Sequence, residues 1–138
     1  MGRNKEAEEL LRAVVTAQPA LYEVQYSLGL LLAEEKQYEQ AARYLAAAAK
    51  GLPNRSRIHY NLGKLLDYLR QDQAAEAALL RAFEIEPQNP DYLQAIVTYY
   101  LKQKKYREAQ QIAEQILARD PSSPLGRELL DLDRKSVV

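Results

Sequence analysis

Few residues in this chain are of the types that carry out covalent or acid–base chemistry. The sequence has no cysteine and one histidine, His59, which excludes a thiolate nucleophile, a cysteine-ligated metal and any two-histidine site. Adjacent carboxylates, such as Glu8–Glu9 and Glu34–Glu35, stand on expected helices and point to different sides, so they form no acid–base pair. Phosphate-binding loops, nucleophile elbows and HExxH motifs are missing from the sequence. We therefore expect no enzymatic activity, no cofactor and no metal site.

The single histidine has two interpretations. An isolated His59 could act as a proton switch near neutral pH. Its place in an expected helix that packs against a neighbouring helix instead favours a histidine packed in the core, and we adopt that interpretation.

The charge balance argues against nucleic acid as a partner. The 19 Lys and Arg residues match 19 Asp and Glu residues, which gives a formal net charge of zero. The one basic run, Lys102, Lys104, Lys105 and Arg107, coincides with an expected turn and fits a solvated face. No apolar stretch approaches the roughly 20 residues that cross a bilayer, and the first ten residues lack the apolar run of a signal peptide. The sequence leaves the compartment unknown.

The chain repeats itself every 34 residues. Three sets of positions recur at this period: Pro19, Pro53, Pro87 and Pro121; Ala7, Ala41, Ala75 and Ala109; Leu28, Leu62, Ile96 and Leu130. Three sets of positions that recur at one spacing predict a protein built from repeated structural units.

Each repeat has the apolar spacing of two α-helices. In the first complete repeat, apolar residues recur at three- and four-residue steps over Tyr22–Glu35 and again over Tyr38–Leu52. The following proline stops the second helix, and Ser56 and Asn89 are expected to cap the helices that come next. Helices of about 14 residues are marginal alone in water, so each pair must be stabilised by its neighbours. The expected fold class is all-α.

This pattern resembles the tetratricopeptide repeat (TPR) family, whose period is 34 residues. The resemblance implies a right-handed superhelical α-solenoid of about seven to eight helices, formed as a single domain over residues 1–138. Its expected parts are the second helix of an incomplete repeat (4–19), three repeats (22–55, 56–89 and 90–123) and a C-terminal capping helix (124–135). The chain departs from the family where tryptophan is frequent (Gln25, His59 and Leu93), where glycine is frequent in the turn (Lys36, Arg70 and Lys104) and at Val97, where glycine is expected in the first helix.

Two further expectations concern a longer protein to which the chain could belong. Because residues 4–19 match only the second helix of a repeat, we expect a fragment of a longer protein. The amino-acid sequence of the repeats is also similar to that of bacterial TPR arrays, including those attached to multihaem cytochromes. Any haem would then lie outside this chain, which has no cysteine.

The resemblance implies a ligand-binding concave groove, lined by the first helix of each repeat. The residues that it places there are Tyr26, Leu30, Arg57, Tyr60, Lys64, Asp67, Asp91, Gln94 and Thr98. Tyr and Arg are over-represented where partners bind tightly, although the charged members could also be solvated side chains that pair with each other.

A chaperone carboxylate clamp, the best-known TPR binding mode, is not expected here. Of the clamp residues only Asn61 is present, and Tyr26, Leu30, Asp91 and Ala95 occupy positions where the clamp has Lys, Asn, Lys and Arg. Without those cations a bound terminal carboxylate would be unpaired.

The predicted function is a protein–protein interaction scaffold that binds a peptide or helix of an unidentified protein in the groove. One alternative is homo-oligomerisation through repeat ends, because the apolar stripe of Leu10, Leu11, Val14 and Val15 would be partly uncovered. The other is an accessory domain of a larger enzyme or cytochrome.

Overall fold

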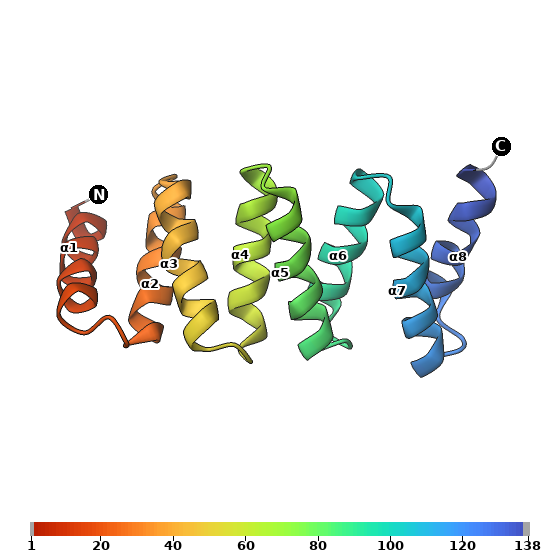
Figure 1. Cartoon of the computed structure of the whole chain (residues 1–138), viewed down its shortest axis with the longest axis horizontal. Helices are drawn as coiled ribbons and strands as arrows, with labels where there is room; N and C mark the ends of the chain where they lie inside the picture. Colours follow the sequence, from red (N-terminus) through yellow and green to blue (C-terminus); the bar gives the residue numbers. More distant parts are fainter. Residues whose placement is uncertain (1, 137–138) are drawn as a thin grey trace. The chain divides into compact units, whose positions relative to one another are not determined.

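The computed structural model describes the backbone of residues 2–136 and the side chains of residues 3–131. This part of the chain folds into eight α-helices and contains no strand (Figure 1). The helices are α1 (Gly2–Ala17), α2 (Tyr22–Glu34), α3 (Tyr38–Gly51), α4 (Ser56–Tyr68), α5 (Asp72–Ile85), α6 (Pro90–Lys102), α7 (Tyr106–Arg119) and α8 (Pro124–Ser136). The predicted all-α class and helix–turn–helix pairs are confirmed.

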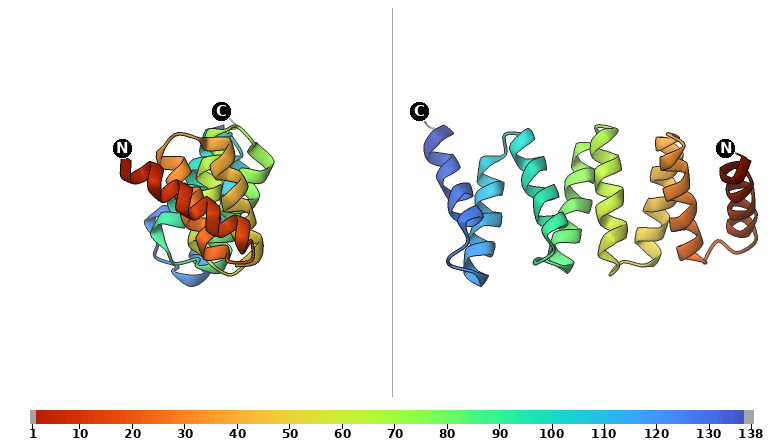
Figure 2. Two further views of the ribbon diagram at one scale, coloured as in Figure 1. Left: turned by 90° about the vertical axis from the view of Figure 1, so that its left-hand side faces the viewer. Right: turned by 180° about the vertical axis from the view of Figure 1, so that it is seen from behind.

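The described chain divides into two compact units, one up to Tyr92 and one from Leu93 onward. In the first unit α2 packs against α3 and α4 against α5, and α3 also contacts α4. Helix α1 packs on α2 but is inclined to α2 and α3, as the left view of Figure 2 shows. Buried aliphatic side chains of both helix pairs form the core of this unit, among them Leu28, Leu45, Ile58, Leu79 and Ala82.

The turns inside the repeats are held by residues in a left-handed conformation. Lys36, Arg70 and Lys104 have φ angles of 64°, 60° and 58°, at the positions where the family often has glycine. At each turn the next residue donates its N–H to a carbonyl five residues earlier, as from Gln37 to Leu32 at 2.9 Å. This 6→1 bond is the Schellman motif, which closes a helix C-terminus.

Glycines in the first helices allow close packing against the second helices. A Cβ atom at Gly29 would lie 2.9 Å from Leu45 Cδ2, and one at Gly63 would lie 2.7 Å from Leu79 Cδ2. These distances are shorter than real Cβ contacts allow. In both of these repeats, a glycine in the first helix therefore packs against a leucine in the second helix.

The second unit contains the rest of α6 together with α7 and α8, and α8 packs on α7. Leu129 of α8 is buried, and Gly126 lies so close to Leu117 that a Cβ would come within 2.7 Å of its Cγ. Val97 and Ala113 are both buried, and they occupy the places that Gly63 and Leu79 have one repeat earlier. The small and the large residue have thus exchanged helices.

The two predicted helix caps differ in outcome. Asn89 accepts a hydrogen bond from the Asp91 N–H at 2.9 Å, which confirms it as the cap of α6. Ser56 was expected to cap α4, but the residue before the helix is Arg55, which makes no side-chain cap bond. Ser56 is buried, and its hydroxyl donates instead to Tyr92 Oη at 3.1 Å.

Candidate functional site

An arginine that lies against two neighbouring tyrosine rings marks the face of α4 where the groove was predicted. The Arg57 guanidinium carbon lies 5.1 Å from the ring centre of Tyr60 and 5.1 Å from that of Tyr92. The two rings are 5.2 Å apart, and Arg57 also lies 3.5 Å from the Asp91 carboxylate. Stacking on aromatic faces stabilises a guanidinium without burying its charge, so this cluster presents a fixed cation at the surface.

Lys64 connects this cluster to a hollow between α2 and α4. Its ammonium lies 5.0 Å from the centre of the Tyr60 ring, one turn earlier on α4. The hollow has a volume of about 250 Å³. Its lining consists of Leu30, Ala33, Tyr38, Leu45, Asn61, Lys64, Leu65 and Tyr68. Leu30 is 37% exposed, so an apolar surface lies beside a lysine that forms no ion pair among the described residues.

The structure brings together most of the predicted groove residues of the first unit. Arg57, Tyr60, Lys64 and Asp91 form the cluster, with Leu30 at the adjoining hollow. Tyr26 joins them through Asn61, whose amide donates to Tyr26 Oη at 2.7 Å. We call these six residues and Tyr92 the A-helix face.

Three predicted groove residues are not included in the A-helix face. Asp67 is half-buried near the end of α4, whereas Gln94 and Thr98 are exposed side chains of α6 in the second unit. The sequence reasoning also missed Tyr92, which is 2% exposed and contacts both Arg57 and Tyr60. Its position directly after Asp91 was a weak signal, because an aromatic residue in a helix usually indicates core packing.

His59 is not the core residue that the sequence predicted. The ring is half-buried, and Nε2 lies 2.8 Å from the Pro53 carbonyl oxygen. The expected apolar packing is replaced by a hydrogen bond because the preceding loop turns its carbonyl toward the ring.

Arg12 makes polar contacts that join helix α1 to α3. Its guanidinium pairs with Glu8 at 2.8 Å and donates to Gln40 Oε1 at 2.6 Å in α3. The hydrogen bond from Arg12 lowers the pKa of Glu8 below its ordinary value. A hydrogen bond with the Glu8 carboxylate raises the pKa of Glu35, at the end of α2, above its ordinary value.

The described residues offer neither a metal-ion site nor a membrane-spanning helix. They contain no group of three or more His, Asp or Glu side chains that could hold a metal ion. Within the same residues, no helix is long and apolar enough to cross a membrane.

Comparison with known families supplies the identification. Two models of the tetratricopeptide repeat match residues 1–56 and 32–98, so that together they span the chain from residue 1 to residue 98. The chain is a TPR protein. Repeats of this family are typically non-catalytic scaffolds for protein–protein interactions, which is the class of function that membership supports.

Solved structures of other TPR proteins share the fold. The crystal structure of MamA aligns with 98% of this chain and 79% of its own at a TM-score of 0.76 and 19% identity. A tetratricopeptide repeat protein from Parabacteroides merdae aligns with 98% of this chain and 55% of its own, with a TM-score of 0.76 and 22% sequence identity. The structure of Naa15/Naa10 bound to HypK-THB aligns over 90% of this TPR chain and 19% of its own, with a TM-score of 0.71 and 20% sequence identity. No curated protein sequence matches the chain significantly.

Proposed function

We propose that this TPR protein binds a peptide segment of a partner protein on the A-helix face. The observation that carries the proposal is the position of Arg57 against the adjoining rings of Tyr60 and Tyr92, with Lys64 over the same Tyr60 ring. Aromatic and arginine side chains that are already held in place lose little entropy when a ligand binds. A structure with the same fold, Naa15/Naa10 bound to HypK-THB, is itself a protein complex.

The surface suits a segment with an apolar and an acidic residue. The hollow beside Leu30 and Ala33 would take an apolar side chain. Lys64 lies at its rim and would meet a carboxylate of the same segment. Arg57 already has Asp91 as a partner, so Lys64 is the cation with more to gain from an acidic ligand.

Selection of peptides from a displayed library, followed by isothermal titration of the best binders, tests this proposal. Tyr60→Ala and Lys64→Ala are expected to weaken binding about tenfold or more, since hot-spot truncations typically cost at least 2 kcal/mol. Arg107→Ala is the matched control, because Arg107 is an exposed cation of α7. Selected peptides whose affinity is the same in all three variants would contradict binding on the A-helix face.

A second candidate function is self-association through α1. Leu10 is 69% exposed and Val14 is 36% exposed, one turn apart on this helix. Side chains of this kind on one stripe favour pairing with another apolar surface. Light scattering after size-exclusion chromatography, over a hundredfold concentration range, tests it: association predicts a mass that rises above 15.7 kDa and returns to it in Leu10→Gln/Val14→Gln. A constant mass would rule this function out.

A further inference from the structure

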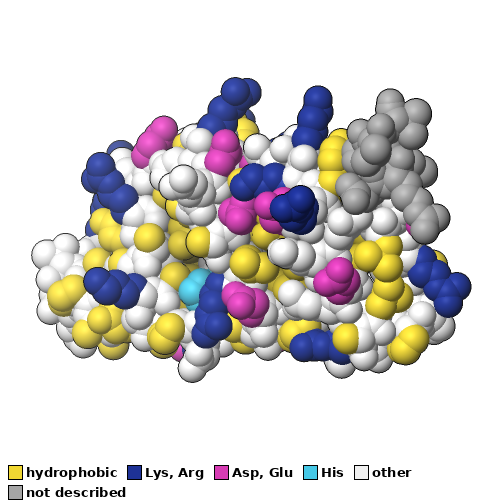
Figure 3. Space-filling model, turned by 45° about the vertical axis from the view of Figure 1, so that its right-hand side comes forward, with side chains coloured by type: hydrophobic (Ala, Val, Ile, Leu, Met, Phe, Trp, Pro, Cys, Tyr) yellow, Lys and Arg dark blue, Asp and Glu magenta, His cyan; other side chains and the backbone are white. Residues whose placement is uncertain are grey.

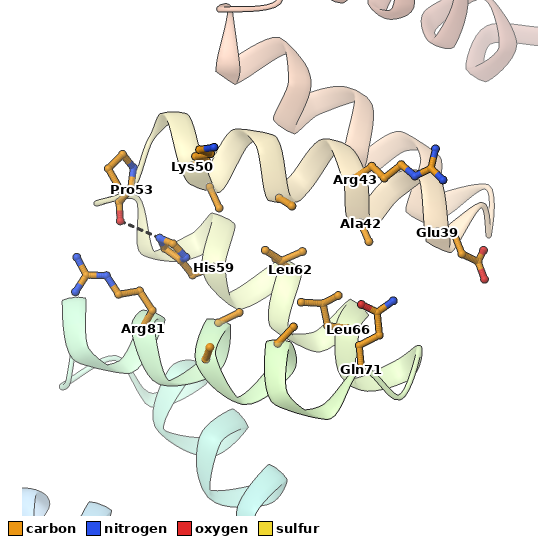
Figure 4. A pocket seen from close by; sticks show the side chains of 15 residues that line it. Glu39, Ala42, Arg43, Lys50, Pro53, His59, Leu62, Leu66, Gln71 and Arg81 are labelled. Atoms are coloured by element: carbon orange, nitrogen blue, oxygen red, sulfur yellow. Dashed lines mark hydrogen bonds between the residues drawn. The ribbon is translucent and has the colours of Figure 1, made fainter.

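A second hollow lies on the other side of α4, between α3 and α5, and the proposed function does not use it. Figure 4 shows α4 as its floor, with Leu62, Leu66 and His59 directed into it. Its volume is about 820 Å³. We call it the α3–α5 groove. The only histidine of the chain is visible at the surface in Figure 3, next to hydrophobic side chains.

The walls of the α3–α5 groove are lined by alanines. They are Ala42, Ala46 and Ala49 of α3 and Ala74, Ala77 and Ala78 of α5. Such short side chains leave room between the two wall helices and allow a third helix to approach them closely, because interaxial distance depends on the side chains at the contact. The walls are helices, whose backbone groups are bonded internally, so they offer no edge to which an extended strand could pair.

The rim of this groove is basic. Three cations, Arg43, Lys50 and Arg81, line it against one carboxylate, Glu39. None of the three cations forms an ion pair with a described residue, and Arg81 donates only to the neutral Asn54 amide oxygen, at 3.4 Å. In Figure 4 Lys50 and Arg81 come from opposite walls at the His59 end, and Arg43 lies toward the other end.

The dimensions match a short helix. Glu39 and Lys50 stand eleven positions apart on α3, which is about 16 Å or three helical turns at 1.5 Å per residue. Arg43 and Lys50 are seven positions apart, so they lie on the same side of α3. Carboxylates at a similar spacing on a bound helix would meet both.

We propose that the α3–α5 groove binds an acidic amphipathic helix of a partner protein. Its apolar stripe would cover Leu62, Leu66 and the wall alanines, and its Asp or Glu side chains would pair with Arg43, Lys50 and Arg81. This interaction is independent of the A-helix face, because it uses residues on the opposite side of α4.

The test is fluorescence anisotropy with the full chain and a labelled synthetic 14-residue helix. The probe carries Leu and Ala at three- and four-residue spacing with Glu on both flanks, and the control peptide has Lys in place of each Glu. We expect the Glu peptide to bind better than the Lys peptide. Arg43→Glu/Arg81→Glu should weaken the Glu peptide at least tenfold and strengthen the Lys peptide.

Two other variants separate this surface from its alternatives. Ala46→Gln/Ala77→Gln changes exposed wall positions, keeps the charge and should also weaken the Glu peptide, while circular dichroism confirms that each variant is folded. Tyr60→Ala should leave its affinity unchanged. Equal binding of both peptides, or loss of binding in Tyr60→Ala, would overturn the proposal. A synthetic peptide of residues 2–17 that displaces the probe at equal concentration would also overturn it, since the occupant would then be a second copy of this chain.

Discussion

His59 Nε2 lies 2.8 Å from the carbonyl oxygen of Pro53, and the same bond exists one repeat earlier. There Gln25 Nε2 donates to the Pro19 carbonyl oxygen at 2.5 Å. Both donors stand 34 positions apart, as do both acceptors. A carbonyl can only accept, so His59 must carry a proton on Nε2. The position where the family often has tryptophan thus fastens α2 and α4, the first helices of two repeats, to the loops that precede them, whereas Leu93 in the third repeat has no side-chain donor.

This equivalence predicts how substitutions of His59 behave. His59→Gln restores the donor of the earlier repeat and should leave the free energy of unfolding nearly unchanged. His59→Leu keeps the bulk but removes the donor, and should lower it by about 1 kcal/mol, the usual net value of a hydrogen bond. Urea unfolding measures both. A leucine variant as stable as the glutamine variant would show that the bond contributes nothing.

A second prediction concerns the glycines in the first helices. A Cβ at Gly63 would lie 2.7 Å from Leu79 Cδ2 and 3.0 Å from its backbone nitrogen, so Gly63→Val should destabilise the protein by about 1–3 kcal/mol through overpacking. The third repeat has Val97 and Ala113 at these positions. Gly63→Val/Leu79→Ala should therefore be more stable than the sum of its single variants. A double-mutant cycle measures the coupling, and strict additivity would contradict it.

The repeat period, the helices and the family could be predicted from the sequence because they depend on spacing alone. The α3–α5 groove could not, because the run Ala46–Ala49 reads equally well as helix propensity and as core. Only the packing of α3 and α5 on α4 decides which alanines remain outside. Tyr92 was missed for a similar reason: its partners Arg57 and Tyr60 lie more than 30 positions earlier.

The left-handed turn residues give a third prediction. Arg70 has a φ of 60°, a region that costs residues with a Cβ about 1–2 kcal/mol and glycine little. Arg70→Gly is expected to raise the free energy of unfolding by about 0.5–1 kcal/mol. This gain is smaller than the strain that is relieved, because glycine also has more chain entropy in the unfolded state. Arg43→Gly is the control: it lies inside α3 and should lower stability by about 1 kcal/mol. If both substitutions lowered the free energy of unfolding, the left-handed backbone at Arg70 would not be strained.

The carboxylates beside Arg12 predict a pH dependence. The pKa of Glu8 is lowered by its bond to Arg12, so its stabilising contribution is present above the unfolded-state pKa and is lost as the pH falls through the folded-state pKa. The pKa of Glu35 is raised by its bond with Glu8, so its contribution is present at low pH and is lost as the pH rises. Glu35→Gln should therefore be more stable than the natural chain at pH 7, with the gain shrinking toward pH 4. Glu8→Gln should be less stable at pH 7. Urea titrations across this range measure both, and equal pH profiles in the two variants would contradict the assignment.

The residues at the clamp positions predict that an acidic chaperone tail does not bind. Asn61, the one matching residue, donates an amide hydrogen to Tyr26, and Tyr26 itself stands where the clamp has its first lysine. Asp91 replaces a second clamp lysine and pairs with Arg57 at 3.5 Å. A terminal carboxylate bound at this second clamp position would meet the Asp91 carboxylate instead of the lysine of the clamp, and like charges at short range are unfavourable. Isothermal titration with a synthetic C-terminal chaperone peptide should show no binding at micromolar concentrations. Micromolar affinity that is lost in Asn61→Ala would mean that this face grips a carboxylate without the usual cations.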